Sequence, residues 1–297
     1  MRFLITAILL IAGVPEPETQ RSTAASPSRR VMSFNIRYDN PGDGEHAWPN
    51  RRDLVSQIIL FHGTDLLGVQ EALEHQVRQL DEALAGFGWV GVGRSDGKAA
   101  GEFTPIFYRE DRLELLESGT FWLSPAPEEP GSKGWDAALP RIATWAKLRD
   151  RAAGRTFLAM NTHFDHVGEE ARRRSASLIV EKATALAGEL PIILLGDFNA
   201  EPDSVTYQTL AGAFRDAREE SEGGHFGPHG TFGTFEPRKE PARRIDYIFI
   251  RDAQVIREAT LADHWDGRHA SDHWPVFAEV RWQAAGAATS TAPREPA

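Results

Sequence analysis

The chain has 297 residues, a formal net charge of -10 and no cysteine. Without cysteine, thiol catalysis, cysteine-ligated metals and disulfide bonds are excluded. Proteins that bind nucleic acid usually carry a surplus of Lys and Arg, so the acidic balance makes nucleic acid a less favoured partner than a small substrate.

Both ends of the chain differ in composition from the rest. An apolar stretch at 3–14 follows Met1 and Arg2, and it is too short to span a bilayer but long enough for the core of a secretory signal. Residues 1–28 are therefore expected to be a signal peptide and flexible spacer, and the protein to be exported, either periplasmic or secreted. We expect no stable membrane anchor in the mature chain, because there is no cysteine to carry a lipid, and we expect a monomer.

Residues 284–297 have almost no bulky apolar side chains, so they are expected to form a disordered tail. No Pro-, Gly- or Ser-rich linker divides the region between these ends. The sequence therefore predicts a single folded domain over residues 29–283.

Short apolar runs bounded by Gly, Pro, Asp or Asn recur through this domain and predict strands. Helical spacing of apolar residues predicts helices at 51–62, 74–85 and 169–187, and a further short helix after "EPDS", capped by Asp203 or Ser204. Helices are too few to alternate with every strand. The pattern favours an α/β fold of the α+β type, with two facing sheets and helices outside. The strand-like runs lie at 30–38, 65–71, 89–94, 103–109, 113–123, 143–150, 155–164, 191–199, 244–250 and 274–282.

Polar residues of one chemical kind end several of these runs or lie beside them. Side chains at the ends of packed strands can converge on one rim of a sheet although they are distant in sequence. A cluster of carboxylates needs a cation, and oxygen ligands favour a hard one, Mg²⁺ with Mn²⁺ as the alternative. The residues concerned are Asn35, Glu71, Asn161, His163, Asp197, Asn199, Asp246, Asp272 and His273.

Each of these residues has a chemistry that suits a phosphate ester. Glu71 and Asp272 suit the metal. The imidazoles of His163 and His273 can stabilise charge on a phosphoryl oxygen, with an acid such as Asp246 to orient one ring. Asp197 can serve as general base for water, which Asn199 orients. The spacing of His163 and His166 also leaves a zinc site open.

Six segments, "SFNIR", "GVQE", "NTHFDH", "GDFNAEP", "RIDYIFI" and "SDHWPV", resemble in their order the motifs of the endonuclease/exonuclease/phosphatase superfamily. The resemblance spans residues 31–280. It implies a four-layer α/β/β/α sandwich of two mostly antiparallel sheets, and a metal-dependent phosphoesterase acting by in-line water attack.

By position, the resemblance makes Asn35 a contact of the metal site, Glu71 the metal-binding glutamate and Asp272 a metal-linked aspartate. It makes His163, Asp197, Asn199, Asp246 and His273 the catalytic group. Whether Asp197 or His273 accepts the proton is left open.

Outside the motifs, the sequence offers candidates for substrate binding. Arg141 is the strongest, because arginine can hold phosphate through two parallel hydrogen bonds. The other candidates outside the motifs are His46, Trp48, Trp265 and Arg268, and Asn161 inside "NTHFDH" is a further one.

Three functions are open at this point. A phosphoesterase acting on a small or lipid-linked phosphate ester, either a diester or a monoester, is favoured by the acidic balance. A nuclease is the alternative, either an endonuclease or a 3'-5' exoribonuclease. A non-catalytic binding module is disfavoured, because Glu71, Asp197 and His273 are all present.

Overall fold

The computed structural model describes residues 27–233, 235 and 242–283, so the predicted signal peptide and most of its spacer, and the predicted tail, lie outside the described residues. One sheet has seven strands in the order β10-β12-β15-β1-β2-β4-β3. The first strand of the chain, β1, starts at Ser28, one residue before the predicted start of the domain. The strands are β1 (Ser28–Asn35), β2 (Leu66–Gln70), β3 (Phe87–Val90), β4 (Ile106–Arg109), β10 (His225–Phe226), β12 (Ala253–Thr260) and β15 (Val276–Trp282).

A second sheet has six strands in the order β5-β6-β7-β8-β11-β9, and a separate two-stranded hairpin is formed by β13 and β14. The strands of the second sheet are β5 (Leu113–Trp122), β6 (Ile142–Asp150), β7 (Thr156–His163), β8 (Ile192–Asp197), β9 (Arg215–Asp216) and β11 (Asp246–Arg251). The hairpin strands are β13 (His264–Trp265) and β14 (Arg268–His269).

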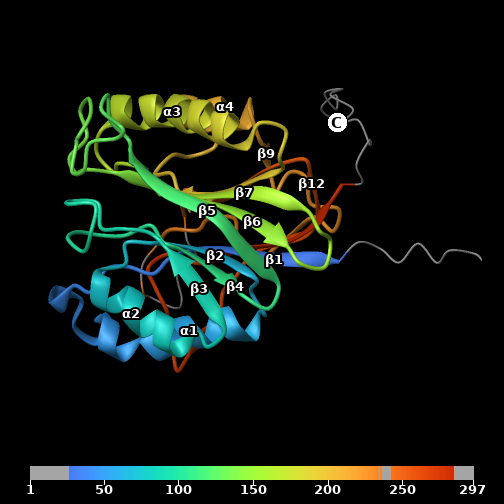
Figure 1. The fold of residues 1–297 in the computed structure, drawn as a ribbon. Helices are drawn as coiled ribbons and strands as arrows, with labels where there is room; N and C mark the ends of the chain where they lie inside the picture. Colours follow the sequence, from blue (N-terminus) through green and yellow to red (C-terminus); the bar gives the residue numbers. More distant parts are fainter. Residues whose placement is uncertain (1–26, 234, 236–241, 284–297) are drawn as a thin grey trace, which may run out of the picture.

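Helices cover the outer face of each sheet, as Figure 1 shows. Below the first sheet in this view lie α1 (Arg52–Phe61) and α2 (Glu74–Ala83), and above the second lie α3 (Glu169–Ala187) and α4 (Val205–Ala211). Two short 3₁₀ turns, η1 (Pro41–His46) and η2 (Trp48–Asn50), precede α1. The predicted four-layer sandwich is confirmed, and each predicted helix lies within two residues of its expected bounds.

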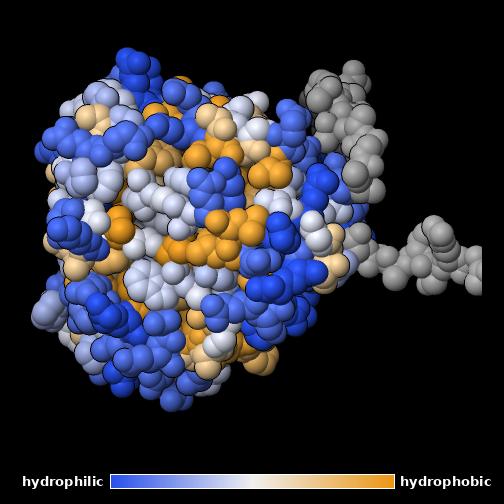
Figure 2. Space-filling model, in the orientation of Figure 1, coloured by the Kyte–Doolittle hydropathy of each residue, from blue (hydrophilic) through white to orange (hydrophobic). Residues whose placement is uncertain are grey.

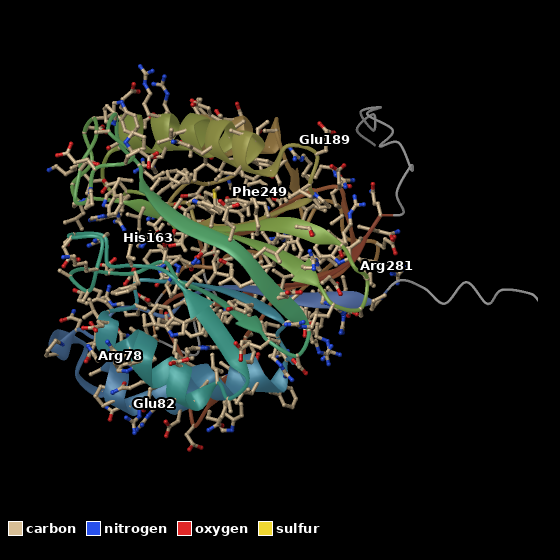
Figure 3. All side chains as sticks on the ribbon, in the orientation of Figure 1. Arg78, Glu82, His163, Glu189, Phe249 and Arg281 are labelled. Atoms are coloured by element: carbon tan, nitrogen blue, oxygen red, sulfur yellow. The ribbon has the colours of Figure 1, made fainter. Side chains whose placement is uncertain are left out.

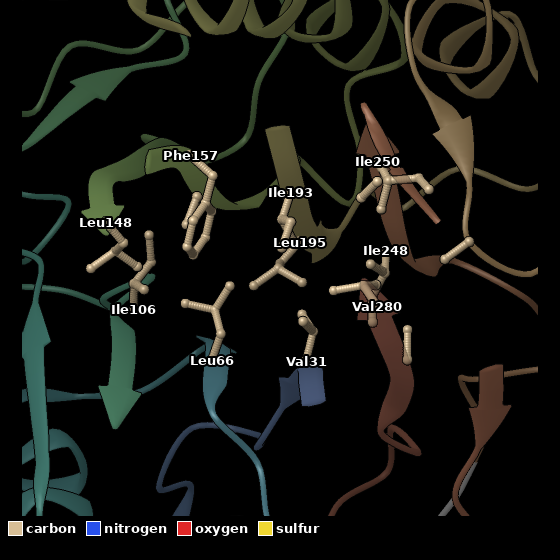
Figure 4. Packing of buried hydrophobic residues seen from close by; sticks show 14 of the residues in the cluster. Val31, Leu66, Ile106, Leu148, Phe157, Ile193, Leu195, Ile248, Ile250 and Val280 are labelled. Carbon is tan, nitrogen blue, oxygen red and sulfur yellow. The ribbon is translucent and has the colours of Figure 1, made fainter. Parts of the chain in front are cut away.

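Three apolar clusters hold the layers together. The central one lies between the sheets, where Leu66 and Val31 of the first sheet face Leu195, Phe157 and Leu148 of the second (Figure 4). Burying one such side chain contributes about 1.5–3 kcal/mol. The other two clusters pack α1 and α2 on the first sheet and α3 and α4 on the second. These layers give the rim between the sheets a rigid support.

Strand direction explains why the polar residues meet at this rim. Each sheet contains a parallel pair, β1 with β2 and β7 with β8, whose carboxyl ends necessarily lie at the same edge. The strands β15 and β11 run antiparallel to β1 and β8, so they begin at that edge. Figure 3 places His163, the last residue of β7, at the edge between the two sheets.

The outside of the molecule is mainly hydrophilic where the helix layers lie, at the top and bottom of the view in Figure 2. None of the helices that the structure describes is long and apolar enough to cross a membrane.

Candidate active site

An open cavity of about 380 Å³ lies at the rim where the two sheets meet. Three of its residues end strands or directly follow them, and others come from the loops that join the strands. We refer to it as the active-site cavity. It is lined by Arg37, Tyr38, Glu71, Glu102, Leu139, Arg141, His163, His166, Asp197, Asn199, Phe232, Ile245, Asp272 and His273.

Asn35 lies just behind the cavity and joins the two sheets. Its amide oxygen accepts the backbone N–H of Arg37 at 3.0 Å, an atom that can only donate, and this contact fixes the orientation of the amide. The amide nitrogen therefore donates to Glu71 Oε1 at 3.0 Å and to Asp197 Oδ2 at 2.9 Å. In this orientation Asn35 presents a donor rather than a metal ligand to the acids, and it holds two carboxylates of different sheets in one place.

A buried aspartate, histidine and aspartate form the centre of the site. The carboxylate of Asp246 accepts a hydrogen bond from His273 Nδ1 at 2.9 Å and from the hydroxyl of Thr231 at 2.6 Å. His273 Nε2 faces Asp197 Oδ2 at 3.8 Å. Burial by itself lowers the pKa of His273, but Asp246 and Asp197 outweigh burial and raise this pKa to about 10. His273 is therefore an imidazolium at neutral pH.

Asp197 has the opposite behaviour. Burial and the neighbouring charge of Asp246 raise its pKa to about 7, although the charge of His273 and hydrogen bonds from Asn199 and Asn35 lower it. A carboxyl group with a pKa near 7 exchanges protons readily at neutral pH.

The second imidazole of the site stays neutral. Burial, followed by the charges of Arg141 and Arg94, lowers the pKa of His163 well below its usual value. The side-chain amide of Asn199 donates to the carbonyl of Phe164 at 3.1 Å, so its nitrogen also faces His163 Nε2, at 3.2 Å. His163 Nε2 is thus the acceptor, and its proton resides on Nδ1.

Three residues of the cavity, with Arg37 (φ +57°) among them, have a left-handed backbone conformation that residues other than glycine rarely adopt. Glu71 has φ +65° and Asn199 has φ +48°. A residue other than glycine in this region is strained by about 1–3 kcal/mol, less for asparagine. In Glu71 the strain turns the carboxylate at the end of β2 towards Asn35 and the cavity.

The donor set fits a divalent metal ion. Burial and the charge of Glu71 raise the pKa of Asp272, and the raised pKa of Asp197 has a similar origin, so negative charge is in excess on this side of the cavity. A bound cation would remove this repulsion, and carboxylate oxygens suit a hard ion. Ligand atoms of Glu71, His163 and Asp197 lie within 4.8 Å of one another. Among the described residues, His166 belongs to no group of three potential metal ligands with this spacing, so the predicted zinc alternative gains no support.

The opposite wall of the cavity holds groups that the sequence did not single out. Glu102 accepts two hydrogen bonds from Arg94, at 2.7 and 2.8 Å. Asp165 accepts backbone N–H groups of the 138–139 and 167–168 segments, which together with Arg141 outweigh its burial and lower its pKa to about 2. Only the position of Asp165 inside "NTHFDH" offered a signal, because Glu102 and Arg94 lie in a loop of ordinary composition.

Arg141 lines the cavity, as predicted, and its relative exposure is 5%. Its Nη2 donates to His166 Nδ1 at 2.9 Å, and its Nε lies 3.5 Å from Asp165 Oδ2. This bond occupies Nδ1 of His166.

Three predicted substrate contacts lie elsewhere. Asn161 is fully buried between the sheets, where its amide donates to the carbonyls of Val69 and Pro105 at 2.8 and 2.9 Å. Trp48 is buried beside α2 and donates to Gln79 at 2.6 Å. The ring of His46 stacks on Phe235 with centroids 4.5 Å apart. None of the three lines the active-site cavity.

Trp265 and Arg268 also lie apart from the cavity, on the β13–β14 hairpin. Both side chains are exposed, and Trp265 contributes to a separate surface groove with Leu60 and Phe61 of α1. The structure therefore brings together the predicted catalytic and metal residues, and among the predicted substrate residues only Arg141.

A family model described as the Endonuclease/Exonuclease/phosphatase family matches residues 32–273. Among solved structures, an endonuclease/exonuclease/phosphatase family protein from Bacteroides thetaiotaomicron is 38% identical, with a TM-score of 0.83 over 86% of this chain and 96% of that chain. A mannosyl-6-phosphatase from the same species is also 38% identical, with a TM-score of 0.82 over 86% of this chain and all of that chain.

Similarity to curated proteins is weaker. Nocturnin from Drosophila melanogaster is 26% identical over 177 residues, which are 56% of this chain and 26% of that protein. The chain thus spans about a quarter of the length of this relative. The human nocturnin catalytic domain, at 20% identity and a TM-score of 0.68 over 87% of this chain and 96% of that domain, shares the fold.

Proposed function

Because the chain belongs to the endonuclease/exonuclease/phosphatase family, we propose that its active-site cavity hydrolyses a phosphate ester by in-line attack of water, with a divalent metal ion as cofactor. The proposal is carried by the difference in pKa between two buried neighbouring side chains, the carboxyl group of Asp197 and the imidazole of His273. Asp197, with a pKa of about 7, can accept a proton, whereas His273, with a pKa of about 10, cannot. A base and a cation 3.8 Å apart can activate water and stabilise phosphoryl charge at one site.

Mg²⁺ is the proposed metal, with Mn²⁺ as a substitute, held by the carboxylates of Glu71 and Asp272 in the cavity wall. Asn35 supports the ion indirectly, by fixing the position of Glu71. When bound, the ion polarises the phosphoryl group and offsets its charge.

The remaining steps belong to the side chains. Asp197 takes the proton of the attacking water, which the side-chain amide of Asn199 orients, while Asn35 holds the carboxylate of Asp197 in place. His273 donates a hydrogen bond from Nε2 to a phosphoryl oxygen while Asp246 holds its ring, so charge that develops on the oxygen is stabilised. The bond between phosphorus and the leaving oxygen breaks as the bond to water forms. The base left open by the sequence is thus assigned to Asp197.

We propose a phosphate ester of a small polar molecule as substrate, with a phosphomonoester favoured. Support comes from the size of the cavity and from the 38% identity to a mannosyl-6-phosphatase along its whole chain. The nuclease alternative is supported by the match to nocturnin in sequence, which is weaker and covers less of the chain.

A substrate panel with purified protein tests this function. Aryl phosphate, bis-aryl phosphate, hexose phosphates, single-stranded RNA and duplex DNA would be compared, each with Mg²⁺ and with EDTA. We expect metal-dependent release of inorganic phosphate from monoesters. Cleavage confined to RNA or DNA would replace the proposal with the nuclease alternative.

We also propose that the protein is exported, for which the apolar stretch at 3–14 is the support, and that it is a monomer. Fractionation of cells that express the full chain, and light scattering of the purified product, would test both.

A further inference from the structure

Three polar atoms in one wall of the active-site cavity face one another without being bonded. Glu102 Oε2 lies 4.0 Å from Arg141 Nη1 and 3.9 Å from His163 Nδ1. Both nitrogens are buried, and neither has a hydrogen-bond partner among the residues that the structure describes. All three residues line the cavity. We call these three atoms the hydroxyl subsite.

The three atoms have fixed hydrogen-bonding roles. Arg141 Nη1 can only donate, and His163 Nδ1 carries the proton because Nε2 faces the amide of Asn199. Glu102 Oε2 accepts from Arg94 and retains a further lone pair. Two donors therefore lie about 4 Å from one shared acceptor, Glu102 Oε2.

The spacing suits a bridging oxygen atom. Two atoms about 4 Å apart cannot bond directly, but an oxygen placed between them can lie about 2.8 Å from each. Only a group that both donates and accepts can bridge one of these donors to Glu102 Oε2, and a hydroxyl is such a group.

Charge argues against an anion at this position. Arg94 is paired with Glu102 through two hydrogen bonds, and Arg141 lies beside Asp165, so two cations are balanced by two carboxylates. A second phosphate of a polynucleotide would meet Glu102 without a surplus of positive charge to compensate. A neutral, hydroxylated group meets no such penalty.

We propose that the hydroxyl subsite binds a hydroxyl group of the leaving alcohol, and that the substrate is a monoester of phosphate with a sugar or a related polyol. The proposal rests on the phosphoesterase function stated above and specifies its substrate class. Arg141 and Glu102 are then specificity-determining residues, and His163 joins the subsite to the phosphoryl centre.

Two substrates with one skeleton test the proposal. A hexose 6-phosphate and cyclohexylmethyl phosphate share a six-membered ring, a methylene group and the phosphate, but only the sugar carries hydroxyls. We expect wild-type kcat/KM to be at least about 100-fold higher for the hexose phosphate, because buried polar groups left unpaired by the analogue disfavour it. The ratio of the two kcat/KM values is the readout.

Glu102→Gln and Arg141→Lys should each reduce this ratio by about 10-fold or more, through loss of a charged hydrogen-bonding group. Glu181→Gln, on the exposed side of α3, is the matched control and should preserve the ratio. Thermal unfolding of every variant identifies any that fails to fold, and Glu102→Gln keeps the test intact if Arg141→Lys does not fold.

The outcomes separate the two proposals. Equal hydrolysis of both monoesters by the wild type would overturn the hydroxyl subsite and leave the phosphoesterase standing. Equal losses on both substrates in the variants would also overturn it, because the residues would then act on the phosphoryl centre or on the fold. Absence of activity on any monoester, with cleavage of RNA or DNA, would defeat the proposed function itself.

Discussion

Asp246 should determine the charge of His273, and Asp246→Asn removes that carboxylate with little change in shape. The raised pKa of His273, from 6.5 to about 10, corresponds to roughly 5 kcal/mol of preference for the charged ring, at about 1.36 kcal/mol per pKa unit. Asp246 is the largest of the contributions that raise it. Without this charge, burial dominates and the ring should be neutral at pH 7.5.

The expected loss follows from that neutral ring. Removing one charged or polar donor to a developing oxyanion lowers kcat by about 10²- to 10³-fold, and we expect a loss of this size at pH 7.5. The sign of the pH dependence is also defined. In the wild type His273 is charged below about pH 10, so its deprotonation does not reduce activity between pH 7 and 9. In Asp246→Asn the ring should lose its proton within the measured range, so the remaining activity should fall as pH rises.

Steady-state kcat for an aryl phosphate from pH 5 to 9.5 measures both effects. The acid limb should move as well, to lower pH, because Asp246 also raises the pKa of Asp197. Asp203→Asn, at an exposed position before α4, is the matched control. A kcat within threefold of the wild type, with no loss of activity as pH rises to 9.5, would refute the assignment of His273 as the cationic donor.

Further changes test the metal, the fold and the excluded contacts. EDTA should stop hydrolysis, and Mg²⁺ or Mn²⁺ should restore it; recovery with Zn²⁺ alone would contradict the oxygen-ligand site. Glu71→Gln should raise the Mg²⁺ concentration for half-maximal activity by about 10-fold or more, as loss of a charged ligand requires, and an unchanged titration would remove Glu71 from the site. Asn161→Ala should lower the free energy of unfolding by about 3 kcal/mol in urea titrations, because buried carbonyls lose their donors; a raised KM with unchanged stability would restore it as a substrate contact. Trp265→Ala should change kcat/KM for a small phosphate ester by less than about threefold, and a larger loss would show that the hairpin reaches the substrate.

The strand ends were predictable because their signal is local. An apolar run that stops on Asp, Asn, Glu or His indicates both the strand and its polar terminus. The parallel pairs β1–β2 and β7–β8 then place these termini at one edge, so the convergence of these polar residues could be predicted without tertiary detail.

The distance of a strand residue from the rim of the sheets was harder to predict. Asn161 and His163 are two residues apart on β7 and project to the same side, so both suit a site by type and spacing. Two residues correspond to about 6.6 Å along a strand, which places Asn161 between the sheets while His163 reaches the rim. Gly68 of the facing sheet leaves room for this amide, since an added Cβ would lie 2.7 Å from its oxygen. A single strand read alone does not show where the opposite sheet ends.

The far wall of the cavity was not predictable for a different reason. Glu102 and Arg94 approach one another through the return of a loop to itself, in which Arg94 N–H also binds the carbonyl of Glu102. Such pairing depends on the path of the loop and leaves no periodic pattern in the sequence.

The pairing of β8 with β11 has a consequence for how such a protein can change over evolution. Asp197 stands directly opposite Asp246 in this antiparallel pair, so both acids project from the same face. Inserting or deleting one residue within either strand would turn one acid to the opposite face and separate the proposed base, Asp197, from Asp246, which holds the ring of His273. Insertions and deletions are therefore tolerable in the surface loops, where they can adapt the cavity to a new leaving group. Within β8 and β11, residues can be substituted, but the register of the two strands cannot shift without loss of the paired acids.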